Sequence, residues 1–109
     1  MRAALQSALG DGALVLCHVS HVYETGCSLY FTVAARQGDD PLAQWAGAKR
    51  AASQAMVEAG ATITHHHAVG TDHRPWLVHE IGEVGVRVLR AVKAELDPAG
   101  VLNPGVLVP

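Results

Sequence analysis

Two runs of alternating residues separated by a turn signal constrain the fold of this chain most. Residues 13–23 and 27–35 are rich in β-branched, aromatic and other apolar side chains, and Glu24-Thr25-Gly26 lies between them. Because the connection is so short, we expect the two strands to form an antiparallel hairpin. Apolar residues fall on both faces of the first strand, so we expect that strand to be covered on both sides.

The register of this hairpin decides which polar side chains meet. If Tyr23 pairs with Gly26, then His21 shares a face with Tyr30. If the loop is one residue longer, His18 and Ser20 share that face instead. Both registers stay open at this point.

A helix is predicted on each side of the hairpin. Residues 1–9 favour a short helix that ends in the glycines of residues 10–12. Asp40-Pro41 is a typical helix start, with a carboxylate cap followed by a proline, and this helix is expected to reach about Ala59. Its larger apolar residues are expected to pack on the sheet: Leu42, Trp45, Ala52 and Met56.

The second half of the chain is predicted to hold a strand and further helix. Residues 61–64 favour a short strand that leads into His65-His66-His67. Pro75 opens a helical segment after the loop of residues 68–74, and a stronger helix is expected from about Glu83. That helix would end before Pro98, and the apolar tail of residues 100–109 would pack against something. Its expected apolar face consists of Val84 or Gly85, Val88, Val92 and Leu96.

The predicted order of elements, α-β-β-α-β-α, indicates an α+β fold. In such a fold a small antiparallel sheet carries helices packed on one face.

Composition narrows the classes of function. Half of the residues are apolar and 17% are charged, which excludes a disordered chain. The formal net charge is −2 and the basic residues form no run, so we expect no nucleic-acid partner. Cys17 and Cys27 form no disulfide framework, and we expect them to be reduced thiols in a cytoplasmic protein. Because the chain is both short and rich in apolar residues, we expect part of its apolar surface to face a partner or another domain.

Seven histidines suggest a site for proton transfer or binding. The triplet His65–His67 offers imidazoles that titrate near neutral pH, but only Asp72 supplies a nearby carboxylate, so no metal is predicted. Tyr30 is either a half-buried strand aromatic or a phenol that exchanges a proton with nearby imidazoles. Arg74 is either a solvated charge or a bidentate ligand for an anionic substrate group. No glycine-rich phosphate loop is present.

Four motifs together resemble a known family. Residues 17–31 (CHVSHVYETGCSLYF), 62–70 (TITHHHAVG), 74–76 (RPW) and 96–105 (LDPAGVLNPG) are similar to the C-terminal part of FAD-linked oxidases of the vanillyl-alcohol oxidase type. The resemblance implies that residues 1–109 are the C-terminal part of a larger substrate (cap) domain. It also implies FAD, held mainly by an FAD-binding domain that is absent from this chain and would be its partner.

Within that family the closest resemblance is to the alkylglycerone-phosphate synthase branch. In the 2-hydroxy-acid dehydrogenase branch two His and one Glu bind a metal, and a further His is the base. Here His21 matches the first ligand, but Tyr30 and His66 stand in place of the other two, and His67 stands at the base. The synthase branch has a Tyr and a triple His at these places.

The synthase resemblance implies a reaction and roles. An acyl group on dihydroxyacetone phosphate would be exchanged for a long-chain alcohol by way of a flavin adduct. Tyr30 would transfer the proton, and His66 and His67 would assist as catalytic residues. The implied contacts with substrate or cofactor are His65, Arg74, His21 and Asn103.

Other consequences and alternatives remain at this stage. A lipid substrate would bring the protein to a membrane surface, a homodimer is one expected assembly, and the isolated chain should be inactive. Only Arg74 keeps a positive charge just after the triple His, where the synthases are more basic, so another substrate is an alternative. Two further alternatives for the function are a metal-assisted 2-hydroxy-acid dehydrogenase or oxidase and a non-enzymatic α+β module.

Overall fold

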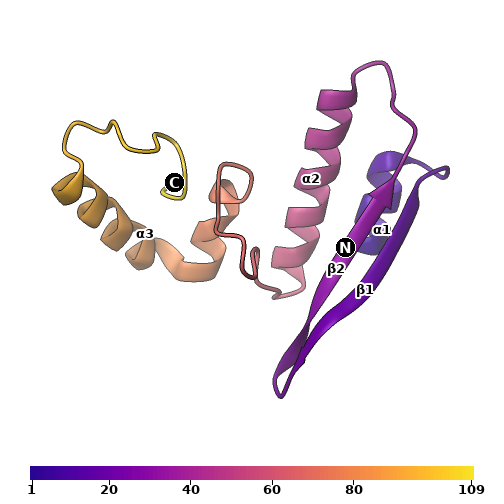
Figure 1. Cartoon of the computed structure of the whole chain (residues 1–109), viewed down its shortest axis with the longest axis horizontal. Helices are drawn as coiled ribbons and strands as arrows, with labels where there is room; N and C mark the ends of the chain where they lie inside the picture. Colours follow the sequence, from indigo (N-terminus) through magenta and orange to yellow (C-terminus); the bar gives the residue numbers. More distant parts are fainter. The chain divides into compact units, whose positions relative to one another are not determined.

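A computed structural model describes all 109 residues and shows an α+β fold (Figure 1). The chain forms two compact units, residues 1–55 and residues 56–109. No helix is both long and apolar enough to span a bilayer. In chain order the elements are α1 (Arg2–Leu9), β1 (Leu14–Tyr23), β2 (Gly26–Ala34), α2 (Pro41–Glu58), the 3₁₀ helix η1 (Arg74–Trp76) and α3 (Leu77–Leu96).

The predicted hairpin is present, and it contains a β-bulge. Near the turn Tyr23 pairs with Gly26 and His21 pairs with Ser28, but farther along the ladder His18 pairs with Tyr30. The register shifts between Val19 and His21, which leaves Ser20 as an extra residue on β1. Each of the two registers that the sequence left open therefore holds for one part of the hairpin.

One face of the hairpin packs against α1 and α2. Val15 of β1 is 2% exposed and forms a core with residues from both helices, and Phe31 and Val33 of β2 pack on it. Helices on one face of the sheet were predicted, and this is confirmed. Cover on both faces was wrong for this chain, because Leu16 and Tyr30 on the opposite face are 49% and 62% exposed. The core residues are Leu5, Val15, Ala48 and Ala52.

Helix α2 begins as predicted but buries a different stripe. The Asp40 Oδ1 accepts a hydrogen bond of 2.9 Å from the backbone N–H of Ala43, which caps the helix. Leu42 and Trp45, expected to pack on the sheet, are 81% and 55% exposed. Small side chains let a helix approach a sheet closely, and the buried residues here are Ala48, Ala52 and Ser53.

The predicted third strand is absent. The backbone N–H of Ile63 donates to the carboxylate of Glu80 at 3.1 Å rather than to a neighbouring strand, so residues 61–64 form an irregular segment. The sheet therefore has two strands only.

The helical segments near the C-terminus follow the predicted division. Gly82, with φ 70° and ψ 170°, interrupts α3 and separates its first turns from the long part that begins at Glu83. The predicted apolar stripe is present but uncovered within this chain, with Val84 63% and Val88 57% exposed. Val86, on another side of the helix, is buried instead.

The apolar tail returns to α3 (Figure 1) and is tied to it by hydrogen bonds. The predicted packing of its apolar side chains is not seen within this chain, because Val101 is 70% and Leu102 61% exposed. Asp97 accepts hydrogen bonds of 3.0 Å from the backbone N–H groups of Val101 and Leu102, and Lys93 forms an ion pair with it. The hydrogen bond from Lys93 and the two backbone donors lower the pKa of Asp97, although burial opposes them. At the chain end, the Arg90 Nε donates to the Pro109 carbonyl at 3.0 Å.

Candidate functional site

The bulge places two imidazoles and a phenol on one face of the hairpin. Directly opposed residues of an antiparallel pair point to the same side, and alternate residues of β2 do so too. His18 opposes Tyr30, and His21 opposes Ser28, so all four side chains share a face. In a regular strand His18 and His21 would point to opposite faces, because they are three residues apart. The extra residue at Ser20 removes that conflict.

Ser20 also holds His21 in a defined state. The Ser20 hydroxyl donates to the Ser28 carbonyl at 3.3 Å. The Nδ1 of His21 lies 3.2 Å from the Oγ of Ser20. A hydroxyl has one proton, so when that proton is donated to the Ser28 carbonyl, Nδ1 is the donor in the second contact. In the neutral ring the lone pair is then on Nε2. The imidazole also stacks with Tyr23, with ring centroids 6.3 Å apart and planes 6° from parallel.

The triple histidine lies in a tight exposed loop of the second unit. The rings of His65 and His66 have centroids 3.7 Å apart, and His67 is exposed. The loop leaves one buried residue, Ile63, and returns to another, Val69. Two of its imidazoles, those of His65 and His66, are therefore close together, and all three are at the surface.

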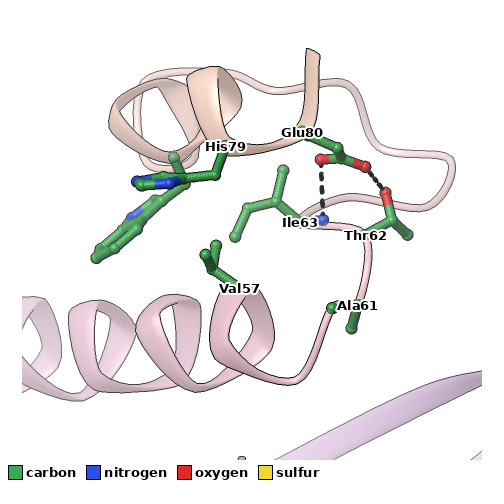
Figure 2. A pocket seen from close by; sticks show the side chains of 8 residues that line it. Val57, Ala61, Thr62, Ile63, His79 and Glu80 are labelled. Atoms are coloured by element: carbon green, nitrogen blue, oxygen red, sulfur yellow. Dashed lines mark hydrogen bonds between the residues drawn. The ribbon is translucent and has the colours of Figure 1, made fainter. Parts of the chain in front are cut away.

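An open pocket of about 330 Å³ lies beside the start of this loop (Figure 2). Its walls include His79, whose ring lies 6.3 Å from that of Trp76, and Glu80. Glu80 is fully engaged, because one carboxylate oxygen accepts from the Thr62 hydroxyl and the other from the Ile63 N–H. Figure 2 shows both bonds crossing from the helix to the chain below it. In this pocket Glu80 holds the chain in place.

Arg74 and Asn103, the predicted ligands of the second unit outside the triple histidine, both help to shape the tail. The Arg74 Nη1 donates to the carbonyl of Gly105 at 3.0 Å. Asn103 adopts φ 43°, and its carbonyl accepts from the Val106 N–H at 3.2 Å. A guanidinium has further donors, so binding of an anionic group by Arg74 stays a prediction.

The predicted site residues fall into two groups, one in each unit. Tyr30 and His21 share the hairpin face, whereas the histidine loop, Arg74 and Asn103 belong to the second unit. No group of three or more His, Cys, Asp or Glu side chains is placed to share a metal ion.

Sequence reasoning missed the residues that support these groups. Ser20, Thr64 and Glu80 act through hydrogen bonds to other site residues or to the backbone around them. For Ser20 a signal exists, since only an extra residue lets His18 and His21 share a face. Glu80 gives no comparable local signal, because its partners precede it by 17 and 18 residues.

Comparison with known proteins places this arrangement in a family. The sequence model described as "FAD linked oxidases, C-terminal domain" matches residues 1–107. The chain belongs to this family. Relatives annotated by name include alkyldihydroxyacetonephosphate synthase of Trypanosoma brucei brucei, 36% identical over 98% of this chain, and that of Dictyostelium discoideum, 34% identical over 92%. The glycolate oxidase subunit GlcD of Bacillus subtilis is 41% identical over 45% of this chain.

These relatives are much longer than the chain. It spans 18% of the trypanosome synthase, 16% of the Dictyostelium synthase and 10% of the glycolate oxidase subunit. Membership of the FAD-linked oxidase family implies FAD, bound mainly by a region outside these residues. The uncovered face of the hairpin combines apolar Leu16 with Ser28 and Tyr30, so its side chains are chemically compatible with a cofactor ring that is apolar with polar edges.

Proposed function

We propose that the full-length protein is an FAD-dependent enzyme of the alkylglycerone-phosphate synthase type. It replaces the acyl group of an acylated dihydroxyacetone phosphate with a long-chain alcohol. The two synthase relatives match more than nine-tenths of the chain, and this extent of similarity supports the synthase reaction over other reactions of the family.

One observation carries the assignment of roles. The bulge at Ser20 brings His18, His21 and Tyr30 to a single exposed face of the hairpin. A neutral phenol cannot take a proton from carbon, but it can pass its own proton to a neutral imidazole and then act as the base. The face therefore has the composition needed to remove a proton from a carbon beside a carbonyl group.

Each residue has a distinct role in this proposal. Tyr30 takes the proton, and His21, whose lone pair is on Nε2, accepts a hydrogen bond from the substrate or relays the proton. When bound, FAD supplies an electrophilic centre for the substrate carbon. His66 and His67 assist proton transfer to and from the leaving acid and the incoming alcohol, while His65, Arg74 and Asn103 contact substrate or cofactor.

Substitutions in the full-length protein test these roles. Tyr30→Phe and His67→Ala should each lower kcat by about 10²- to 10⁴-fold, the usual contribution of a general acid or base. The matched control is Tyr23→Phe, which removes a phenol oxygen from the turn end of the same face and should leave kcat near wild type. Survival of activity in both Tyr30→Phe and His67→Ala would contradict the role assignment.

A second candidate is a 2-hydroxy-acid oxidoreductase. The glycolate oxidase relative favours it, with higher identity over a shorter segment than the synthases. In that reading His21 is a metal ligand. Metal analysis of the purified full-length protein separates the two, since stoichiometric zinc or manganese that is lost in His21→Ala supports the oxidoreductase.

The full-length protein is also proposed to have a partner domain, a dimeric assembly and a membrane surface to which it binds. We propose the FAD-binding domain of the same protein as the partner of this chain, with homodimerisation as a further association. The lipid substrate brings the enzyme to a membrane surface from the cytoplasm, where the exposed Cys17 and Cys27 stay reduced. Flotation of the full-length protein with vesicles that contain long-chain alcohol tests the surface association.

A further inference from the structure

The loop that carries the triple histidine is shaped by side chains. It has no strand or helix of its own, and residues 64–68 lie between two buried anchors, Ile63 and Val69. A loop without ladder hydrogen bonds needs other partners to hold a single shape. Two side chains supply hydrogen bonds. That of Glu80 binds the residues that precede the histidines, and that of Thr64 binds the residue that follows them.

Glu80 holds the entry to the loop. Its carboxylate accepts from the Thr62 hydroxyl and, at 3.1 Å, from the Ile63 N–H (Figure 2). These two donors immediately precede the loop, so Glu80 ties them to the first turn of α3. Because an acceptor with two oxygens serves both donors, the direction in which the chain enters the loop is fixed.

Thr64 closes the loop. Its hydroxyl Oγ1 donates to the carbonyl of Ala68 at 3.0 Å and so bridges the three histidines. Ala68 has φ 57°, a left-handed conformation that is unfavourable for a residue with a Cβ. Such strain persists only where the surroundings over-determine the backbone, and strained positions cluster at functional sites. The Thr64 bond is an interaction that holds Ala68 in this conformation.

We propose that Thr64 and Glu80 are positioning residues that set the places of the His66 and His67 rings. This inference rests on the proposed function, in which those imidazoles assist proton transfer. Neither residue touches the substrate in this proposal, and both act through the backbone on either side of the histidines. Misplacement of a catalytic group by about 1 Å can cost about a hundredfold in rate, so loss of the bridge should reduce turnover more than binding.

The test compares two substitutions of Thr64 in the full-length protein. Thr64→Val removes the hydroxyl and keeps the shape, whereas Thr64→Ser keeps the hydroxyl. We expect Thr64→Val to lower kcat by about tenfold to a hundredfold with KM changed less than about threefold, and Thr64→Ser to stay within about threefold of wild type. If Thr64→Val fails to accumulate, Thr64→Ala replaces it in the comparison with Thr64→Ser.

A second readout does not depend on activity. In protein labelled at the histidine rings, the ring resonances of His66 and His67 should shift in Thr64→Val and remain near wild type in Thr64→Ser. Glu80→Gln, which retains one acceptor oxygen for two donors, should shift them as well. Unchanged resonances in Thr64→Val, or equal damage by Ser and Val, would overturn the positioning role.

The two proposals fail in different ways. If the wild-type protein lacks synthase activity, the proposed function is wrong, and the ring resonances still decide whether Thr64 and Glu80 hold the loop. If wild-type activity is present but Thr64→Val retains it in full, the proposed function stands and the positioning role is wrong.

Discussion

Asp97 shows how a single carboxylate organises the end of the chain. The hydrogen bond from Lys93 and those from the backbone of Val101 and Leu102 lower its pKa, so the folded protein binds fewer protons here than the unfolded chain does. Its stabilising effect is present above the ordinary Asp value of 3.8 and is lost as pH falls through the lower folded pKa. We therefore expect the Val101 and Leu102 amides to lose protection from hydrogen exchange below about pH 4, after correction for intrinsic rates.

A control at the same residue separates charge from shape. Asp97→Asn keeps one carbonyl oxygen but no charge for Lys93. In this variant the two amides should exchange faster already at neutral pH, with little further change between about pH 5 and about pH 2. If Asp97→Asn and the wild type gave the same pH profile, the carboxylate would not be the group that holds the tail.

Among the elements, helix α2 packs on the sheet through its small residues. Ala48 is fully buried, so Ala48→Leu should reduce the free energy of unfolding by about 1–3 kcal/mol through overpacking. Leu42 is 81% exposed, and Leu42→Ala should change that free energy by less than about 0.5 kcal/mol. Urea titrations followed by tryptophan fluorescence measure both. A larger loss of stability in Leu42→Ala than in Ala48→Leu would show instead that the predicted stripe of large residues is the packed face of α2.

The elements also show what the sequence can predict. The bounds of the hairpin strands fall within one residue of those predicted, because alternation and turn chemistry are local. The same is true of the start of α2, which depends on Asp40 and Pro41. The buried face of α2 could not be predicted in this way, because an apolar stripe selects large residues, whereas close approach to the sheet selects small ones.

The missed features all depend on partners distant in sequence. The segment 61–64 has strand-like residues, but its amide bonds to Glu80, and nothing nearby in the sequence indicates that. The bulge required both strands to be considered together, so the sequence left two registers for His21, His18 and Tyr30. The resemblance thus supplies candidate site residues, whose roles stay a prediction, while the residues that hydrogen-bond to the backbone around them could not be found in this way.

Considered as a whole, the chain leaves a long apolar stripe of α3 uncovered. Its members, from 50% to 76% exposed, are Val84, Val88, Val92 and Leu96. Monomeric proteins rarely expose a contiguous apolar patch above a few hundred Å², and such a patch promotes association. Since the chain spans under a fifth of its synthase relatives, we expect this stripe to be covered in the full-length protein. The 109-residue chain by itself should then self-associate.

Sedimentation velocity over a range of concentrations measures this association. The double substitution Val88→Glu with Val92→Lys should shift the chain towards monomer, and the four-residue spacing of a Glu and a Lys favours the helix by about 0.2–0.5 kcal/mol, so far-UV circular dichroism should not change. Ala94→Glu adds a charge on another side of α3 and should leave association as in the wild type. Equal reduction of association by both variants would show that a charged side chain at any exposed position of α3 is sufficient, which would contradict the role of the stripe. A monomeric wild-type chain would show that the stripe needs no cover.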